Sequence, residues 1–576
     1  MKKILLVILL LVLAGAPFLP GLKAGFTNWD DNLILTGNSL VKELSFENAG
    51  AIFSRSFVGT YIPLTVFSYA LEYKAFGLNP FVYHLDNLLL HLLNVLLVFW
   101  LFSLLGQKPA IAFLAALLWA VNPLRVESVV WVTERKDVLY GFFLLSSMAA
   151  YIRWKRSGRL GFYLLSLGLF FLSCLAKGAA VILPLLLLAL DYFCLEPAIR
   201  WRDLFNKAAF LAGSAVFAVI GIFSQAGGDF GARDEQWRAL DKLFIICHNV
   251  LFYLYKTIWP ANLSVYYSYP KNHTGWLPWT YLVSPLLLAG LIWAVWRAAK
   301  KWGRKLLFPA AFFILALLPV LQIKTMMGGA VVAERYSYIP SIPLFLLLSL
   351  AAGRLWHKNA RSLRILIICV FSLAYLLQGY LTWNRTQVWH DSATLWSSLI
   401  DHRPDMLFAY KKRSQAYWES NRIAEALADY DQILRLDPGN MQFRYQRALA
   451  NGRLGRLDLA VSDLDVVIAG EPERSEAYFN RGYAYKQSGR QDQALADFSR
   501  ALEIDPGILN AYMNRAEIYS LQRKYQMALE DYDAALKLSP ANGRIHWKKG
   551  EVFEALGQGA SAVIEFEKAA ELGYNN

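Results

Sequence analysis

Two adjacent acidic residues, Asp30 and Asp31, come soon after an almost wholly apolar stretch, residues 1–20. A carboxylate held at a membrane surface can take a proton from a hydroxyl group that attacks a substrate there. An aspartate that follows Asn28 and Trp29 also suits the first position of a helix, where its oxygen accepts a backbone N–H. The pair by itself is therefore either a general base at a membrane exit or a helix cap.

A polar stripe runs along the otherwise apolar stretch 79–100, because His84, Asn87, His91 and Asn94 are spaced three or four residues apart. Polar side chains are costly in hydrocarbon, so they face protein or a wet cavity. The deeper residues, His91 and Asn94, suit hydrogen bonds between helices. His84 lies nearer the end of the stretch and is predicted to line a site.

Charged residues follow the short apolar stretch 109–122. Glu127 comes soonest after it and is a candidate to line a site. Glu134 and Lys136 lie further along and are expected to belong to a solvated loop, which is the usual place for charged side chains.

A fourth stretch, residues 333–341, combines charge with aromatic rings. Arg335 offers a fork of donors that suits a lipid phosphate, and Tyr336 and Tyr338 are typical of a membrane interface. Glu334 is predicted to line the same site. The alternative is that Glu334 and Arg335 form only an interfacial anchor pair.

The composition is that of a membrane protein with many spans. Hydrophobic residues make up 56% of the chain and charged residues 18%, with a mean hydropathy of +0.32. Residues 407–576 hold 22 basic and 24 acidic residues, so the net charge of +14 comes from the first 406 residues, where basic residues set membrane orientation. The charge therefore does not indicate nucleic-acid binding. The four cysteines show neither zinc nor disulfide spacing, and no metal-ligand motif is present.

Eleven apolar stretches are predicted to cross the membrane, the first as an uncleaved anchor. A twelfth candidate, 241–260, is interpreted as an interfacial or re-entrant segment, because the basic clusters then all lie on the cytoplasmic side. The C-terminus and the stretches 21–80, 122–137, 225–279 and 324–340 would share the outer side. The predicted crossings are 4–20, 81–105, 109–122, 138–153, 160–176, 179–195, 207–224, 280–296, 306–323, 338–353 and 364–382.

The last part of the chain is built from five 34-residue units. In the clearest unit, small and aromatic residues and a final proline, such as Gly482, Phe498 and Pro506, occupy the signature positions of the tetratricopeptide repeat. Such arrays offer a concave binding surface, here for an acceptor or partner protein; the alternative is a scaffold for an assembly. The predicted organisation is a membrane domain (1–390), a connector (391–406) and five repeats (407–440, 441–474, 475–508, 509–542 and 543–576).

Taken in order, these stretches resemble the transmembrane and tetratricopeptide-repeat (TMTC-like) O-mannosyltransferase family, and more broadly the glycosyltransferases of the GT-C fold. The matching segments are "NWDDN", "GLNPFVYHLDNLLLHLLNVLLVF", "NPLRVESVVWVTERKDVL", "LAKGAAVILPLLLLALDYF" and "AERYSYIPSI". The resemblance covers essentially the whole chain. It implies an all-α membrane enzyme that moves a sugar, often mannose, from a polyprenyl phosphate to an acceptor hydroxyl on the outer side, with Asp30 and Asp31 as the catalytic acidic pair.

On this basis, one aspartate of the pair is expected to take the acceptor proton in a single, inverting displacement. The leaving lipid phosphate needs a cation, for which Arg335 is the main candidate, with Lys177 and Arg125 as helpers. No cofactor is required, although an aspartate pair is able to hold a divalent metal. The partners are the lipid-linked donor, the membrane and an acceptor protein.

Two other classes stay open: a non-enzymatic membrane-anchored repeat scaffold for envelope assembly, and a ligase or flippase of lipid-linked glycans. The compact loops and the lack of outer cysteines favour a bacterial inner membrane with the repeats in the periplasm. The alternative is the endoplasmic reticulum membrane with the repeats in the lumen.

Overall fold

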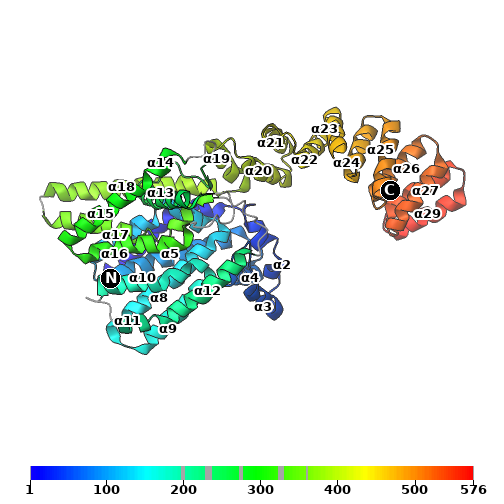
Figure 1. Ribbon diagram of the computed structural model, residues 1–576. Coiled ribbons are helices and arrows are strands. Elements are labelled where there is room, and N and C mark those ends of the chain that lie inside the picture. Colours follow the sequence, from blue (N-terminus) through cyan, green and yellow to red (C-terminus); the bar gives the residue numbers. More distant parts are fainter. Residues whose placement is uncertain are drawn as a thin grey trace. The chain divides into compact units, whose positions relative to one another are not determined.

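The computed structural model describes residues 2–195, 201–226, 237–270, 277–321, 330–358 and 361–574. Over these residues the chain is almost entirely helical, with one short antiparallel pair of strands, β1 (Tyr267–Ser268) and β2 (Ala330–Val332). It divides into two compact units, Met1–His402 and Arg403–Asn576; in Figure 1 the helices up to α19 (Ser392–His402) belong to the first and those from α20 (Leu407–Glu419) on to the second. The predicted all-α class is confirmed. Of the predicted outer stretches, residues 227–236, 271–276 and 324–329 lie outside the described residues.

The first unit combines long apolar helices with short helices in the connections between them. Its longer helices are α1 (Lys2–Gly15), α4 (Pro63–Phe76), α5 (Pro80–Leu104), α6 (Pro109–Ala120), α8 (Arg135–Ser157), α9 (Leu160–Ala176), α10 (Leu183–Leu190), α12 (Ala208–Ala226), α13 (Ala239–Ile258), α15 (Ser284–Trp302), α16 (Leu307–Leu317), α17 (Ile342–Lys358), α18 (Arg361–Val388) and α19 (Ser392–His402). The short ones are α2 (Ser39–Lys42), α3 (Phe46–Ser54), α7 (Val126–Val130), α11 (Trp201–Phe205) and α14 (Trp279–Leu282).

Within the described residues, six helical stretches are long and apolar enough to cross a membrane. A seventh results if α6 and the bent continuation Pro123–Val130, at 61° to it, form one span. Two shorter apolar helices, Leu160–Ala176 and Ile342–Trp356, coincide with further predicted crossings. The first unit is thus a multi-pass membrane bundle, while the count of eleven crossings and the interfacial position of 241–260 stay predictions. The six stretches are Ile4–Lys23, Pro80–Leu104, Gly178–Leu195, Ala208–Gln225, Trp279–Trp302 and Arg361–Val388.

The polar stripe of α5 holds the bundle together. The Asn94 side chain donates to the Val138 carbonyl (2.8 Å) and to the Tyr338 hydroxyl (3.0 Å). His91 Nδ1 lies 2.9 Å from that same hydroxyl, so three segments meet at one buried point. The interpretation of His91 and Asn94 as hydrogen-bonding links between helices is confirmed.

The loop after the Asp pair folds into a small helical layer of α2, α3 and α4. Its apolar side chains share one core with Tyr83 of α5 and with Val132, so the loop is packed against the bundle. The core contains Ile34, Leu35, Val41, Ile52, Ile62, Val66, Tyr69, Ala70, Tyr83 and Val132.

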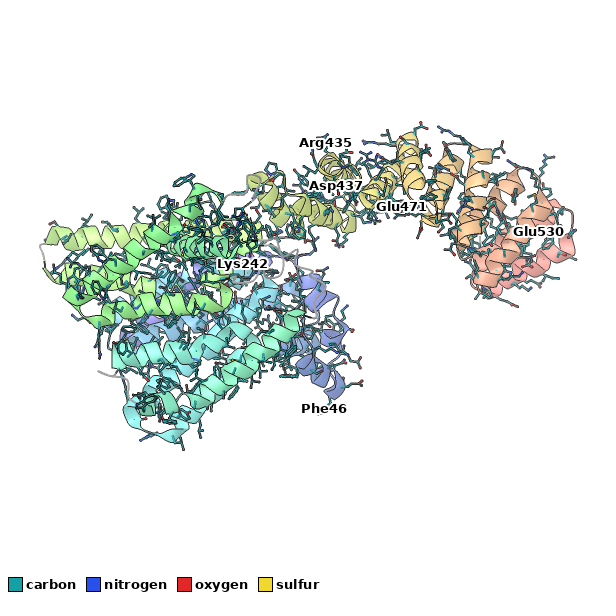
Figure 2. The ribbon with its side chains drawn as sticks, viewed as in Figure 1. Phe46, Lys242, Arg435, Asp437, Glu471 and Glu530 are labelled. Atoms are coloured by element: carbon teal, nitrogen blue, oxygen red, sulfur yellow. The ribbon has the colours of Figure 1, made fainter. Side chains whose placement is uncertain are left out.

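The second unit is a solenoid of five helix pairs. Each pair turns in the left-handed region at the same position, which is glycine in three repeats and Asn421 or Arg523 in the other two. The second helices of the first two repeats end just before an acidic residue that is itself followed by proline. These acidic residues are Asp437 and Glu471, labelled in Figure 2. The pairs are α20 (Leu407–Glu419) with α21 (Ile423–Leu436), α22 (Met441–Arg453) with α23 (Leu457–Gly470), α24 (Ser475–Gln487) with α25 (Gln491–Ile504), α26 (Leu509–Leu521) with α27 (Tyr525–Leu538), and α28 (Gly543–Ala555) with α29 (Gly559–Glu571).

A ladder of ion pairs runs through this solenoid. Arg481, for example, binds Asp497 sixteen residues later (2.7 Å) and Asp465 sixteen residues earlier (2.6 Å). Each such cation joins the two helices of its own repeat, and from the second repeat on it also reaches the repeat before. The pairs within repeats are Arg413–Asp429, Arg447–Asp463, Arg481–Asp497, Arg515–Asp531 and Lys549–Glu565. The backward partners are Asp431, Asp465, Ser499 and Asp533.

Replacement of Arg481 by alanine is expected to destabilise the solenoid by about 2–3 kcal/mol, because the nearly buried Asp497 carboxylate loses its counter-ion. Arg500→Ala is the matched control: its side chain is exposed, and the loss of its solvent-screened ion pairs is expected to change the stability little. Urea unfolding of the full-length protein, read by proteolysis of the solenoid, measures both changes. Equal effects of the two substitutions would show that the ladder does not stabilise the array.

Candidate functional site

Asp31 is a buried anchor for the loop that carries it. Its Oδ2 accepts the backbone N–H (2.7 Å) and the hydroxyl (3.0 Å) of Thr27, and its Oδ1 accepts the Trp131 indole N–H (3.1 Å) and the Thr133 backbone N–H (3.2 Å). The carboxylate does not cap the helical turn that follows. It ties the N-terminal loop to the segment after α7.

Burial raises the pKa of Asp31 to about 6, although hydrogen bonds from Thr27 and Thr133 act in the opposite direction. Between about pH 4 and 6 the folded protein therefore takes up a proton on this residue more readily than the unfolded chain does. The contribution of Asp31 to folding stability falls as the pH rises through that window. The four donors around the carboxylate reduce the cost of burying its charge at neutral pH but do not remove it.

Asp30 lies at the boundary of the site. It is partly exposed, whereas Asp31 beside it is buried. Its charge raises the pKa of Lys136, together with the stronger effect of Glu134 and against the effect of burial. Of the two aspartates, Asp30 is thus the one that solvent reaches, and it lies within the electrostatic range of a cation.

Four tryptophans surround this loop. The Trp29 ring lies 5.0 Å from both Trp131 and Trp396, and Trp131 lies 5.2 Å from Trp389, between ring centroids. The Trp396 indole N–H donates to the Asn28 side chain (2.6 Å). The cluster fixes the residues before Asp30 against the end of α18 and the start of α19.

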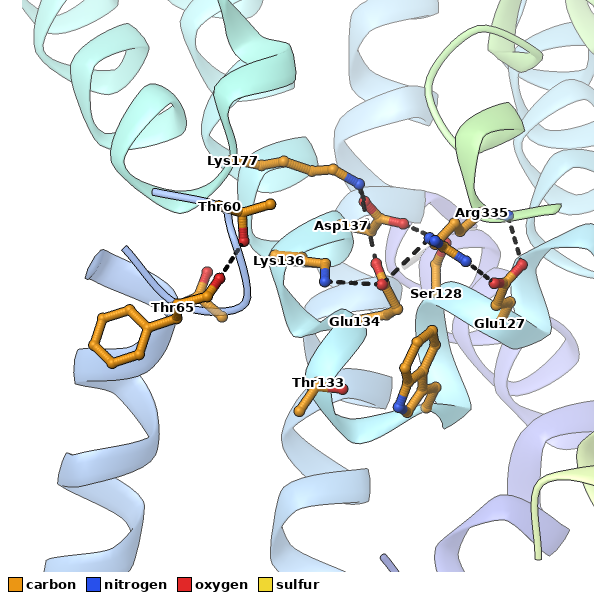
Figure 3. A network of polar contacts seen from close by, with 12 residues as sticks. Thr60, Thr65, Glu127, Ser128, Thr133, Glu134, Lys136, Asp137, Lys177 and Arg335 are labelled. Carbon is orange, nitrogen blue, oxygen red and sulfur yellow. Dashed lines mark hydrogen bonds and ion pairs between the residues drawn. The ribbon is translucent and has the colours of Figure 1, made fainter. Parts of the chain in front are cut away.

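Figure 3 shows a network of three acids, Glu127, Glu134 and Asp137, and three cations, Lys136, Lys177 and Arg335. Arg335 lies between Glu127 and Glu134 and pairs with both; its Nε is 3.3 Å from Glu134. Lys136 lies 2.9 Å from Glu134, and Lys177 pairs with Asp137. The Asp137 carboxylate also accepts from the Ser128 hydroxyl (3.0 Å). Three distant parts of the sequence, residues 127–137, Lys177 and Arg335, therefore meet in one place.

The acids of the network are more deeply buried than its cations. The side chains of Glu127, Glu134 and Asp137 are 2%, 1% and 1% exposed, whereas those of Lys136, Lys177 and Arg335 are 12%, 15% and 18% exposed. Burial alone would raise the pKa of Glu134, but Lys136, Arg335 and Lys177 outweigh it and hold that pKa below its ordinary value. The acids form the buried floor, and the cations form a rim that solvent reaches. We call these three cations the cationic rim.

Aromatic rings back the cationic rim. The Trp131 ring centroid lies 5.5 Å from the Arg335 guanidinium carbon and 5.9 Å from Lys136 Nζ. The Tyr336 ring lies 4.9 Å from Arg335 and 5.5 Å from Lys177 Nζ. Because the Trp131 indole N–H also binds Asp31, one residue connects the Asp pair to the cationic rim.

Glu334 lies on the other side of the same turn, away from the cationic rim. It accepts from Arg385 of α18 (3.0 Å) and from the Tyr267 hydroxyl (3.1 Å). Burial raises its pKa to about 7, against the effect of Arg385. Glu334 thus binds the last membrane helix to β1.

The other predicted site residues are buried in the bundle. Arg125 donates to the Ser337 hydroxyl (2.8 Å) and lies 5.5 Å from the Tyr338 ring. Tyr338 is the hydrogen-bond partner of His91 and Asn94. His84 is buried beside the backbone of Gly25 and Val130. The structure brings Asp30, Asp31, Glu127, Lys177, Arg335 and Tyr336 together, and places Arg125, Tyr338, His84 and Glu334 behind them.

The expectation of a solvated loop around Glu134 and Lys136 is wrong. The Glu134 side chain is buried, and Arg335 and Lys177 pair with it from other segments. Lys136, Asp137 and Trp131 were not among the predicted site residues. The available signal was a tryptophan within a short stretch of alternating acids and bases.

Among the residues that the structure describes, no group of three or more His, Cys, Asp or Glu side chains is arranged to hold a metal ion.

The fold and the site define a multi-pass membrane protein with a charged site at one end of its bundle and a tetratricopeptide solenoid. Models of the tetratricopeptide repeat match residues 411–469, 475–507 and 509–542. Over 459 residues the chain is 24% identical to "Protein O-mannosyl-transferase F38B6.6" of Caenorhabditis elegans, which covers 76% of this chain and 63% of that protein. It is also 24% identical to "Protein O-mannosyl-transferase TMTC1" of Homo sapiens, over 68% of this chain and 49% of that protein.

A shorter match, 35% identical over 150 residues, links 24% of this chain to 17% of "Protein O-mannosyl-transferase TMTC2" of Homo sapiens. The chain thus spans between about half and two thirds of the length of the curated relatives that it matches over most of its sequence. The resemblance to TMTC-like proteins is confirmed. Among solved structures, "Crystal structure of MamA" aligns with 28% of this chain and 94% of its own, at 21% identity and a TM-score of 0.27.

Proposed function

We propose that this protein is an integral-membrane glycosyltransferase that moves mannose from a polyprenyl-phosphate donor to a hydroxyl group of a protein acceptor. The relatives' names support the reaction class. The observation that carries the proposal is the cationic rim over a buried acidic floor, next to a partly exposed aspartate. A lipid phosphate needs cations, and an attacking hydroxyl needs a base.

In this mechanism, Asp30 takes the proton of the acceptor hydroxyl as its oxygen attacks the anomeric carbon. The bond between that carbon and the phosphate oxygen breaks, and the polyprenyl phosphate leaves. Arg335, Lys177 and Lys136 stabilise the charge that develops on the phosphate. A single displacement inverts the anomeric centre, as in GT-C enzymes. This displacement requires no metal ion, because the aspartate accepts the proton and the cations stabilise the leaving phosphate.

Asp31 is a positioning residue in this scheme. It holds the loop that carries Asp30 and orients the Trp131 indole, whose ring backs two cations of the rim. The buried acids of the floor hold the cations in place, and the three cationic side chains stay more exposed than the acids that they pair with. The solenoid binds the acceptor protein. The solenoid and the acceptor lie on the extracytoplasmic side, in a bacterial periplasm or in the lumen of the endoplasmic reticulum.

The test is transfer from labelled polyprenyl-phosphate mannose to a serine- and threonine-containing protein, with the purified full-length protein in liposomes. Labelled acceptor is expected. No transfer, together with normal folding, would overturn the proposal and leave the scaffold class. Transfer only from a diphosphate-linked glycan would favour the ligase class. A reporter fused after Asn576 tests the side of the solenoid independently.

The transfer rate is expected to fall about tenfold per pH unit below about pH 6, because protonated Asp31 loses an acceptor for its four donors. A steady-state pH profile of the wild type measures this decline. In Glu334→Gln, which removes a second carboxyl group whose pKa is raised to about 7, the decline near pH 6 is expected to persist. A rate that stays constant down to pH 5 would remove Asp31 from the positioning role.

A further inference from the structure

An apolar groove of about 780 Å³ lies between α1, α6, α17 and α18. This volume is within the range of ligand pockets in proteins. Most of its lining side chains are hydrocarbon, including Leu13, Ile111, Leu114, Leu118, Ile368 and Phe371. The groove lies along helices that belong to the membrane bundle. An apolar space of this kind does not hold water. Its lining therefore favours hydrocarbon chains as the bound groups.

Polar features mark one end of the groove and one point of its wall. Lys108, the residue before the first turn of α6, belongs to the lining. Trp356 also lines the groove, and the Arg364 guanidinium carbon lies 5.8 Å from the centroid of its ring. Two cations therefore lie at the end where α17 finishes and α18 begins. Along the wall, the Ser349 hydroxyl is buried without a hydrogen-bond partner.

This charged end is remote from the candidate functional site. α6 runs from Pro109 to Ala120, about 18 Å at the rise of an α-helix. Lys108 precedes that helix, whereas Glu127 of the site lies beyond its far end. A donor whose phosphate binds the cationic rim cannot also place this phosphate at Lys108.

We propose that the groove binds an anionic phospholipid from the leaflet at the Lys108 end, with its acyl chains between the four helices and its phosphate against Lys108 and Arg364. The lining takes the chains, and the two cations select a negative headgroup. The bound lipid fills the space between α17 and α18 that protein side chains leave open. This site is separate from the donor site of the proposed function.

The experiment compares retention of phosphatidylglycerol and phosphatidylcholine by the purified full-length protein, counted by native mass spectrometry after detergent exchange. Phosphatidylglycerol is expected to be retained at least about tenfold more strongly. The double variant Lys108→Glu/Arg364→Glu is expected to lose this preference. Lys300→Glu is its control, because Lys300 is exposed and contacts Trp296 on α15, outside the groove.

A second pair of variants tests the hydrocarbon part. Ser372→Trp places a ring in the groove, whereas Leu373→Trp changes the next residue of α18, which is 66% exposed and does not line it. Only Ser372→Trp is expected to lower phosphatidylglycerol retention. Equal retention in both, no preference between the two phospholipids in the wild type, or displacement of phosphatidylglycerol by polyprenyl phosphate would each overturn the proposal. Sugar transfer is measured separately and its absence leaves the lipid result unaffected.

Discussion

Replacement of Asp30 by asparagine is expected to reduce sugar transfer at least about a hundredfold while the protein still folds and inserts. The amide cannot accept the proton of the attacking hydroxyl, and a positioned base contributes roughly 10²- to 10⁴-fold. The side chain is partly exposed, so the substitution does not leave a buried charge without a partner. Single-turnover transfer from labelled polyprenyl-phosphate mannose measures the loss.

Two comparisons make this prediction specific. Glu47→Gln, in the exposed first turn of α3, changes an acid in the same folded loop and is expected to keep full transfer. Asp31→Asn is expected to lower folding stability as well as transfer, because its amide would face donors where an acceptor is needed. Transfer by Asp30→Asn within threefold of the wild type would exclude Asp30 as the base.

Replacement of Arg335 by glutamine is expected to destabilise the membrane unit by about 3 kcal/mol or more, because Glu127 is left buried without its counter-ion. Transfer is expected to disappear with it. Loss of activity in this single variant does not separate a structural role from a role in binding phosphate. The unfolding midpoint in detergent, followed by tryptophan fluorescence, measures the first effect.

The double variant Glu127→Gln/Arg335→Gln separates the two roles. Removal of both charges is expected to restore most of the stability, while transfer stays at least about a hundredfold below the wild type because the leaving phosphate lacks its cation. Arg55→Gln, an exposed arginine of the first loop, is the control for charge alone. Recovery of transfer in the double variant would show that Arg335 only neutralises Glu127.

The repeats and the membrane bundle could be predicted from the sequence because their signals are local. Periodic small residues and prolines define the repeat, and long apolar stretches define spans whatever their neighbours are. The same holds for the stripe of α5, whose residues share one helix face. These features need no knowledge of which distant segments meet.

The site could be predicted only in part. Asp30, Glu127, Lys177 and Arg335 belong to motifs, but the burial of Glu134 depends on Arg335, two hundred residues further along the chain. Likewise, the link from Asp31 to Trp131 spans a hundred residues. A charged loop is predicted to be solvated when its counter-ions belong to distant segments, because the local sequence does not contain them.

The sixteen-residue spacing of the ladder contacts, forward and, from the second repeat on, backward, also bears on how such an array changes length. Excision of residues 475–508 would bring Arg515 to the place of Arg481, where Asp465 already offers a carboxylate instead of the hydroxyl of Ser499. Each remaining ladder contact would again find a partner after the excision. A solenoid built this way can gain or lose whole repeats, and with them binding surface, without any compensating change in the sequence of the membrane bundle.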